Sequence, residues 1–185
     1  MIMKEKTIFL KDGTPAFLVS AAEKDGPAVL ELWKTAAGES DFLLRRPEEY
    51  VHTGFLEGRY LGSLAQSESD LVLLCKVSGE VAGYCQLSRK RYIKNRHRAL
   101  ITVAVAKKYW EKGIGKRLLL EVMEKARDMG IAQLELDVIE GNDRALALYE
   151  TLGFSVAAKK PDAILQPDGR LVGELYLVKK IGSMV

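Results

Sequence analysis

The sequence predicts a single mixed α/β domain with antiparallel strands on its N-terminal side and a parallel pair at its centre. Segments 70–77 and 81–88 are strand patterns joined by a tight turn containing Gly79, which predicts an antiparallel hairpin. Segments 99–106 and 132–139 are strand patterns separated by a long amphipathic helix, which predicts a right-handed βαβ unit with parallel strands. A chain of 185 residues suits one such domain, which we expect to span residues 1–185.

The composition is that of an ordinary soluble protein, with 48% hydrophobic and 29% charged residues and a net charge of +3. No apolar run reaches the roughly 18 residues that a membrane helix needs. The N-terminus lacks a signal-peptide pattern, so we expect a cytoplasmic protein with no membrane association.

The cysteines and histidines do not indicate a metal site. Cys75 and Cys85 lie in predicted strands without a C-x-x-C spacing, so we expect two buried free thiols. His52 and His97 have no ligand partners at a recognisable spacing.

The chain opens with two short apolar runs, 7–10 and 16–22, which flank a turn-rich segment and predict a hairpin. We expect its first part, about residues 1–14, to be a short appendage. A helix then runs from about Asp25 to Ala37, with Trp33 on its core face.

The next stretch, 39–47, has no clean period and is expected to be a loop. A weaker helix is predicted over Glu48 to Gln66. Gly54, Gly58 and Gly62 fall four residues apart within it, on one face. They could permit close backbone packing or leave the helix mobile as a lid, and both alternatives stay open.

Six basic residues crowd the segment between the second hairpin strand and the central strand. A solvated hairpin tip is the favoured interpretation, with a binding patch for an acidic partner as the alternative. The small net charge does not by itself argue for nucleic acid. The six residues are Arg89, Lys90, Arg91, Lys94, Arg96 and Arg98.

Two glycines, Gly113 and Gly115, stand at the start of the helix that follows the central strand. Unpaired N–H groups and the dipole at a helix start bind anions, and glycine lets a ligand approach the backbone. The loop is therefore a candidate phosphate cradle. We expect this helix to bury Leu118, Leu119, Val122, Met123 and Ala126 and to expose Lys116, Arg117, Glu121, Glu124, Lys125 and Asp128.

The C-terminal part is predicted to form one more helix and two strands. Asn142 is the expected N-cap and Gly153 the expected end of the helix. The strands lie near 154–158 and 174–180, around a turn at 167–169. The inward helix face is assigned to Ala145, Leu148, Tyr149 and Leu152.

Three phosphate-binding patterns compete for the glycine loop. The Walker pattern fails because Arg117 follows Gly115-Lys116 where Ser or Thr is needed. The dinucleotide fingerprint is a weak match because Leu118 replaces its third glycine. Segment 110–115 resembles the Gln/Arg-x-x-Gly-x-Gly/Ala loop of the GCN5-related N-acetyltransferases, with Trp110 departing at the first position.

A second block, 141–154, resembles the N-x-x-A-x-x-L-Y-x-x-x-G-F segment of the same family, residue for residue. The resemblance covers roughly residues 15 to 180. It implies a family-like fold in which the central strand splays away from its parallel neighbour, and it implies acetyl-CoA as cosubstrate. The cofactor-binding residues that it implies are Val103, Val105, Trp110, Glu111, Lys112, Gly113, Ile114, Gly115, Lys116, Asn142, Ala145 and Tyr149.

Carried over from the family, Tyr149 is the expected acid for the departing thiolate, although a core tyrosine on a helix face is the alternative. Many relatives place a glutamate three residues before Val103, where this chain has Leu100. The base is therefore unassigned, with Glu135, Asp137 and Glu140 as loose candidates or deprotonation through water. By resemblance the 39–47 loop borders the acceptor, which makes Asp41 and Phe42 weak substrate-site candidates. The alternative is a loop that packs Phe42 and Leu43 beneath itself.

Together these features predict an N-acetyltransferase that moves the acetyl group of acetyl-CoA to a primary amine by direct attack in a ternary complex. The alternative is a non-catalytic acyl-CoA-binding regulatory module, which Leu100 suggests. The amine acceptor is a small molecule or a protein or peptide amine, and one scaffold does not settle the choice. Nucleic acid is not an expected partner, and a homodimer is left open.

Overall fold

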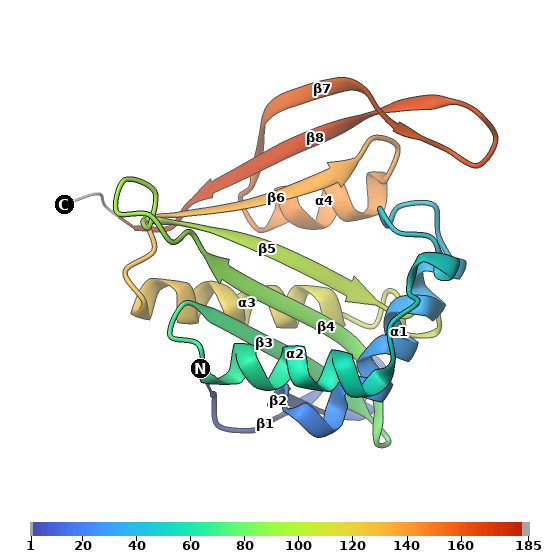
Figure 1. Cartoon of the computed structure of the whole chain (residues 1–185). Helices are drawn as coiled ribbons and strands as arrows, with labels where there is room; N and C mark the ends of the chain where they lie inside the picture. The colour runs from blue at the N-terminus through green and yellow to red at the C-terminus, as the bar shows by residue number, and fades with distance from the viewer. Residues whose placement is uncertain (1, 183–185) are drawn as a thin grey trace.

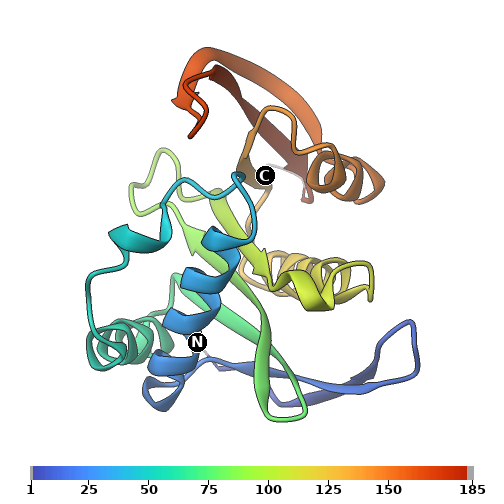
Figure 2. The same ribbon diagram turned by 90° about the vertical axis from the view of Figure 1, so that its right-hand side faces the viewer.

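Residues 2–182, which the computed structural model describes, form one eight-stranded sheet with helices on both faces (Figures 1 and 2). The strand order is β1-β2-β3-β4-β5-β6-β8-β7, and only β5 and β6 are parallel. The predicted mixed α/β fold with a central parallel pair is confirmed. The strands are β1 (Lys6–Phe9), β2 (Pro15–Ser20), β3 (Asp70–Val77), β4 (Glu80–Arg89), β5 (Arg98–Val105), β6 (Gln133–Ile139), β7 (Ser155–Leu165) and β8 (Leu171–Lys180).

The helices form two layers around the sheet. One core joins α3 and α4 to one sheet face, and the other joins α1 and α2 to the opposite face. The helices are α1 (Gly26–Gly38), α2 (Gly54–Gln66), α3 (Ile114–Asp128) and α4 (Asp143–Thr151), with short 3₁₀ helices η1 (Glu23–Asp25), η2 (Pro47–Glu49) and η3 (Lys107–Tyr109).

The opening hairpin, β1 and β2, is the edge of the sheet, because β2 pairs with β3. Ile8 and Leu10 are buried in the main core. The hairpin turn also reaches the glycine loop, where the Lys11 N–H donates to the Lys112 carbonyl at 3.2 Å. The first strands therefore support the loop that precedes α3.

The start of α2 differs from the prediction. The helix begins at Gly54, not at Glu48, because Pro47–Glu49 forms a separate 3₁₀ turn. Thr53 is the N-cap, and its hydroxyl accepts from the Leu56 N–H at 3.3 Å. Thr53 is a residue type that favours an N-cap, but the acidic pair Glu48 and Glu49 is also typical of a first helical turn and led to the earlier predicted start.

The glycines of α2 permit close packing, which is one of the two alternatives that the sequence leaves open. A Cβ atom at Gly58 would overlap the carbonyl oxygen of Glu23, and one at Gly54 would lie 2.7 Å from the Cα of Pro27. Gly26 faces Gly58 in the same way. The start of α1 therefore packs directly on the backbone of α2, and no side chain fits between them.

Helix α3 buries the predicted stripe, including Leu118, Leu119 and Val122. The prediction for Glu121 was wrong. This residue was expected to face water, but it is 6% exposed and forms an ion pair with Lys6 at 2.6 Å. The partner comes from β1, which the helical period of α3 could not reveal.

The C-terminal hairpin is longer than predicted, since β7 spans Ser155–Leu165 and β8 spans Leu171–Lys180. Most of β7 is exposed, and its pairing shifts register between Lys160 and Ile164. Strand β7 pairs only with β8, so this segment carries no alternation of buried and exposed residues from which a strand could be read.

Two further predictions concern the thiols and membrane association. Cys75 and Cys85 are buried and free, as predicted. Burial raises the pKa of the Cys75 thiol to about 11 and raises the pKa of Cys85 further, so both stay protonated at neutral pH. Within residues 2–182 no helix is both long and apolar enough to cross a membrane.

Candidate functional site

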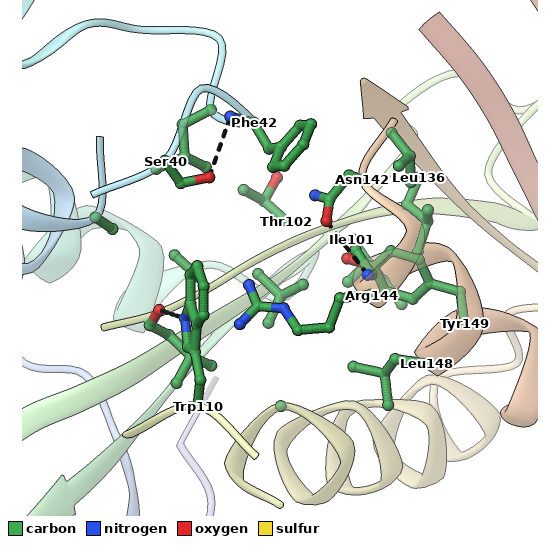
Figure 3. Close-up of a pocket in the computed structure, with 18 of the residues that line it drawn as sticks. Ser40, Phe42, Ile101, Thr102, Trp110, Leu136, Asn142, Arg144, Leu148 and Tyr149 are labelled. Atoms are coloured by element: carbon green, nitrogen blue, oxygen red, sulfur yellow. Dashed lines mark hydrogen bonds between the residues drawn. The ribbon is translucent and has the colours of Figure 1, made fainter. Parts of the chain in front are cut away.

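A cavity of about 580 Å³ opens where the two central strands separate (Figure 3). Strands β5 and β6 pair only from Arg98 to Leu100, opposite Gln133 to Glu135, and beyond Leu100 they splay apart. The gap is bordered by the start of α3, by α4 and by the loop between α1 and α2. The family-like splay that was expected around Val103 and Val105 is therefore present.

The backbone of β5 is open towards this gap. The Ala106 N–H donates to Ala82 of β4 at 3.1 Å, which fixes the direction in which the backbone groups of β5 point. Because these groups alternate along a strand, those of Val103 and Val105 point away from β4 and into the gap. They are placed to pair with an extended ligand as a neighbouring strand would.

The glycine loop forms the end of the cavity at the start of α3. Gly113 is the N-cap with φ at 89°, a left-handed conformation that glycine adopts without strain. The first-turn amides of Ile114, Gly115 and Lys116 have no partner within the helix, since the first helical bond runs from Arg117 to Gly113. These amides and the helix dipole make an anion site.

Lysines surround the loop, but not all of them face the cavity. Lys116 lines it, and so does Lys11 from the β1–β2 turn, which the sequence did not suggest. Lys112 instead pairs with Asp12 at 2.9 Å and does not line the cavity. The Lys112 and Thr14 hydrogen bonds lower the pKa of Asp12 well below its ordinary value.

Trp110, from the loop before α3, and Arg144, from α4, meet within the cavity. The Trp110 indole N–H donates to the carbonyl oxygen of Val105 at 2.7 Å. Arg144 extends from α4 and stacks its guanidinium carbon 3.0 Å from the centre of the Trp110 ring (Figure 3). Burial lowers the pKa of Arg144, with the charge of Glu111 acting in the opposite sense. A cation on an aromatic face is a favourable pair when water is excluded.

Tyr149 lies deep in the cavity wall. It is 7% exposed, and its ring contacts Phe154 edge to face at 5.9 Å between centroids. Burial raises the pKa of its hydroxyl, so the group remains protonated across the neutral range. Within residues 2–182 the hydroxyl has no hydrogen-bond partner, which leaves its proton available to a ligand in the cavity.

Asn142 caps α4, its side-chain oxygen accepting from the Ala145 N–H at 3.3 Å. Phe42 lies against the turn before it, because a Cβ atom on Gly141 would be 3.8 Å from the Phe42 ring. Asp41, by contrast, does not line the cavity, and its carbonyl accepts from Gln166 at 3.5 Å.

Two carboxylates also line the cavity. They belong to Asp137 on β6 and Glu174 on β8. Partial removal of water and the charge of Glu174 raise the pKa of Asp137, whereas Lys160 and Lys90 act to lower it. Glu174 forms an ion pair with Lys160 at 2.7 Å. No described residue donates a hydrogen bond to the Asp137 carboxylate.

The two other acids that the sequence left as candidate bases are engaged. Glu135 is 2% exposed and forms an ion pair with Arg98, which also donates to the Tyr176 hydroxyl at 3.2 Å. Burial raises the pKa of Glu135, but the bonds from Arg98 and Gln133 outweigh it and the net pKa is lowered. Glu140 is bound by Lys159 and by the Gly173 N–H.

The cavity thus gathers most of the residues expected to form the site. Lys112 and Asp41 are the two that it does not include. Sequence reasoning missed Lys11, Thr102, Arg144 and Glu174. Lys11 and Glu174 come from elements outside the recognised motifs, whereas Thr102 and Arg144 lie on β5 and α4 at positions to which the family pattern assigns no role. The expected residues that line the cavity are Phe42, Val103, Val105, Trp110, Glu111, Gly113, Ile114, Gly115, Lys116, Asn142, Ala145 and Tyr149.

Residues 27–154 match the model of the Acetyltransferase (GNAT) family. The chain belongs to this family. In fold it is similar to a GNAT-family acetyltransferase from Streptococcus pneumoniae, with a TM-score of 0.84 and 24% identity over 90% of this chain and 99% of that one. A Salmonella typhimurium protein described as an acetyltransferase and solved with its cofactor acetyl-CoA has a TM-score of 0.80 and 20% identity, over 91% and 95% of the two chains.

Among curated GNAT relatives, the ribosomal protein bS18 alanine N-acetyltransferase of Escherichia coli is 37% identical over 71 residues. The match covers 38% of this chain and 48% of that protein, so the chain spans about half the length of the curated relative that it matches.

No group of three metal-ligating side chains is present within residues 2–182.

Proposed function

We propose that this protein is an N-acetyltransferase that moves the acetyl group of acetyl-CoA to a primary amine, with both substrates in the cavity together. One observation carries the proposal. A single cavity is lined by an anion-binding helix start, by the open edge of β5 and by the carboxylates of Asp137 and Glu174. The family's named acetyltransferases support the same activity.

The described residues fit the cosubstrate. The amides of Ile114, Gly115 and Lys116 would hold the pyrophosphate, and Lys11 and Lys116 would add charge-assisted contacts. The open backbone of Val103 and Val105 would pair with the pantetheine amides. When bound there, acetyl-CoA supplies an activated acetyl group as a thioester.

Tyr149 is the proposed acid. As the amine nitrogen bonds to the acetyl carbon, the carbon–sulfur bond breaks and the sulfur leaves with the electron pair. The buried, protonated Tyr149 hydroxyl donates its proton to that sulfur. The raised pKa supports this role, because the group holds its proton until a strong base is formed beside it.

Asp137 is the proposed base. Of the three acids that the sequence left as candidates, Glu135 is held by Arg98 and Glu140 by Lys159. Asp137 lines the cavity, and its carboxylate accepts no hydrogen bond from any described residue. Its raised pKa brings a carboxylate closer to the pKa range in which a base works well. Leu100, at the family's usual glutamate position, supplies no base.

Thiol release from acetyl-CoA, measured over a panel of amines, amino acids and peptides, tests the activity. Tyr149→Phe should lower kcat tenfold or more while changing the Kd of CoA by less than about threefold, because only proton donation is lost. Tyr50→Phe is the matched control, since Tyr50 is also buried but does not line the cavity. Full activity of Tyr149→Phe would remove the residue from this role.

A second candidate is a CoA-binding module without efficient chemistry, which the absence of an acid at Leu100 favours. It predicts tight CoA binding with no thiol release from any amine. The same panel, accompanied by a calorimetric titration with CoA, separates the two functions.

A further inference from the structure

The part of the cavity that Asp137 lines continues onto an open face of the sheet. On β5 the side chains of Arg98, Leu100 and Thr102 share one face, because Ala99 and Ile101 enter the core beneath α3. The register of Leu100 with Glu135 places Asp137 on that same face. Tyr176 of β8 pairs with Asp137 and contacts Arg98, so the face extends across three strands.

This face leads to the basic hairpin tip, residues 89–96. A second hollow of about 360 Å³, formed largely by residues of the tip, shares Leu100 with the main cavity. The Lys90 N–H donates to the Arg98 carbonyl at 2.9 Å, so the tip begins where the paired part of β5 begins. The charge of Lys90 also lowers the pKa of Asp137, so the two ends of this surface lie within electrostatic reach.

The tip is an ordered turn on which Arg91, Lys94 and Arg96 are exposed. The Tyr92 N–H donates to the Asn95 side chain at 3.1 Å, and the Arg89 side chain donates to the Arg96 carbonyl at 2.6 Å. None of the tip's five basic side chains forms an ion pair with a carboxylate within residues 2–182. Tyr92 is 79% exposed beside them. Five unneutralised cations on an ordered turn attract an anionic ligand. They are Arg89, Lys90, Arg91, Lys94 and Arg96.

The distance between Asp137 and the basic tip sets the length of a ligand that can reach both. Asp137 lies two residues beyond the Leu100–Glu135 pair, level with Thr102, and the tip begins level with Arg98. Four strand residues span about 13 Å. A free amino acid is too short to reach both regions, whereas an extended peptide covers this distance in about four residues.

We propose that the acceptor is the N-terminal amine of a peptide or protein that carries an acidic residue at about position four or five, which the basic tip binds. This rests on the proposed acetyl transfer and names its substrate class. The amine lies against Asp137 and Glu174, and the peptide follows the open face past Leu100. A nucleic acid fits less well, since it would bring phosphates against these two carboxylates.

Peptides with alanine at every position except one test the proposal. A glutamate or a glutamine is moved from position two to position eight, and kcat/KM is measured by thiol release from acetyl-CoA. Glutamate at position four or five should raise kcat/KM about tenfold over glutamine, and the gain should shrink at high salt because the contact is exposed. Anisotropy of labelled peptides with unacetylated CoA should show the same preference in Kd.

A charge reversal on the tip provides the sharper test. The double variant Arg91→Glu and Lys94→Glu should reverse the preference, so that lysine at position four or five becomes better than glutamate. The control is Lys24→Glu with Arg127→Glu, which changes the net charge equally at exposed positions outside both hollows and should keep the preference for glutamate.

The outcomes separate the proposals. Acetylation of peptides without any effect of acid position, or of small amines alone, would overturn the acidic-peptide acceptor and leave the acetyltransferase intact. No thiol release with any amine would overturn the proposed function itself. Binding of single-stranded RNA that is lost in the tip variant, without a peptide preference, would assign the tip to nucleic acid instead.

Discussion

Arg144 stacks on Trp110, with its guanidinium carbon 3.0 Å from the ring centre, while the Trp110 indole N–H donates to Val105. The Val105 carbonyl faces the gap between β5 and β6, where an extended ligand would pair with it. Trp110 therefore occupies a backbone acceptor that the proposed cosubstrate needs. Trp110 is also the residue at which the loop departs from the family pattern.

Binding of CoA is expected to displace the Trp110 indole. Displacement would transfer a half-buried ring towards water, so the tryptophan emission should shift to longer wavelength on titration with CoA. Trp33→Phe leaves Trp110 as the only tryptophan and should keep the shift, whereas Trp110→Phe should lose it. A calorimetric binding signal without any change in Trp110 emission would contradict the displacement.

Lys11 should contribute to CoA affinity even though it belongs to the opening hairpin. It lines the cavity beside Gly113, since a Cβ atom built on Gly113 would lie 3.7 Å from the Cγ of Lys11. Lys11→Ala should weaken CoA binding about three- to fivefold, as expected for an exposed charge near a phosphate. Lys4→Ala, on the same N-terminal segment but outside the cavity, is the control. Equal affinity in the two variants would exclude Lys11 from the site.

The case of Lys11 shows where sequence reasoning ends. Periodicity and turn residues predicted the central strands, and two local motifs predicted Gly113, Asn142 and Tyr149, because each signal is contained in a short stretch. Lys11 and Glu174 reach the cavity only through the pairing of β2 with β3 and of β6 with β8. Such long-range pairing has no local signature in one sequence.

The same limit explains the misplaced elements. Glu121 has the position of an exposed helix residue and is buried by a partner 115 residues away. Strand β7 is exposed along most of its length and is held only by β8. In both cases tertiary contacts override a local pattern that is ambiguous.

Arg98 and Glu135 should stabilise the fold through their ion pair. Arg98→Met would leave the Glu135 carboxylate buried without its partner, which costs on the order of 3 kcal/mol and should lower Tm by about 10 °C. Glu135→Gln should cost less, because Arg98 is a third exposed and water can reach it. Urea unfolding of the two single variants and the double variant measures the coupling.

The pH dependence of this stability has a definite sign. The pKa of Glu135 is lowered in the folded state, so its contribution is present above the unfolded value of about 4.3 and is lost as the pH falls through the folded pKa. The difference in unfolding free energy between the wild type and Glu135→Gln should therefore close in acid. A difference that is constant with pH would show that packing, not charge, is responsible.

Asp137 should determine the acid limb of the pH–rate profile. A base must be deprotonated to act, so kcat/KM should rise with pH through the pKa of Asp137, at a pH above that of an ordinary aspartate because this pKa is raised. Asp137→Asn should lower kcat/KM by about 10²–10⁴ and remove this limb. If Asp137→Asn kept both the wild-type kcat/KM and the acid limb of the profile, deprotonation would be assigned to water.

Two charged residues near Asp137 test its assignment as the base, because they shift its pKa in opposite directions. Glu174→Gln removes a negative charge that raises the pKa of Asp137, so the acid limb should move to lower pH. Lys160→Met removes a positive charge that lowers the same pKa, so the limb should move to higher pH. Opposite shifts require a titrating group within electrostatic reach of both residues. Because Glu135 is already held by Arg98 and Glu140 by Lys159, Asp137 is the carboxylate that meets this requirement.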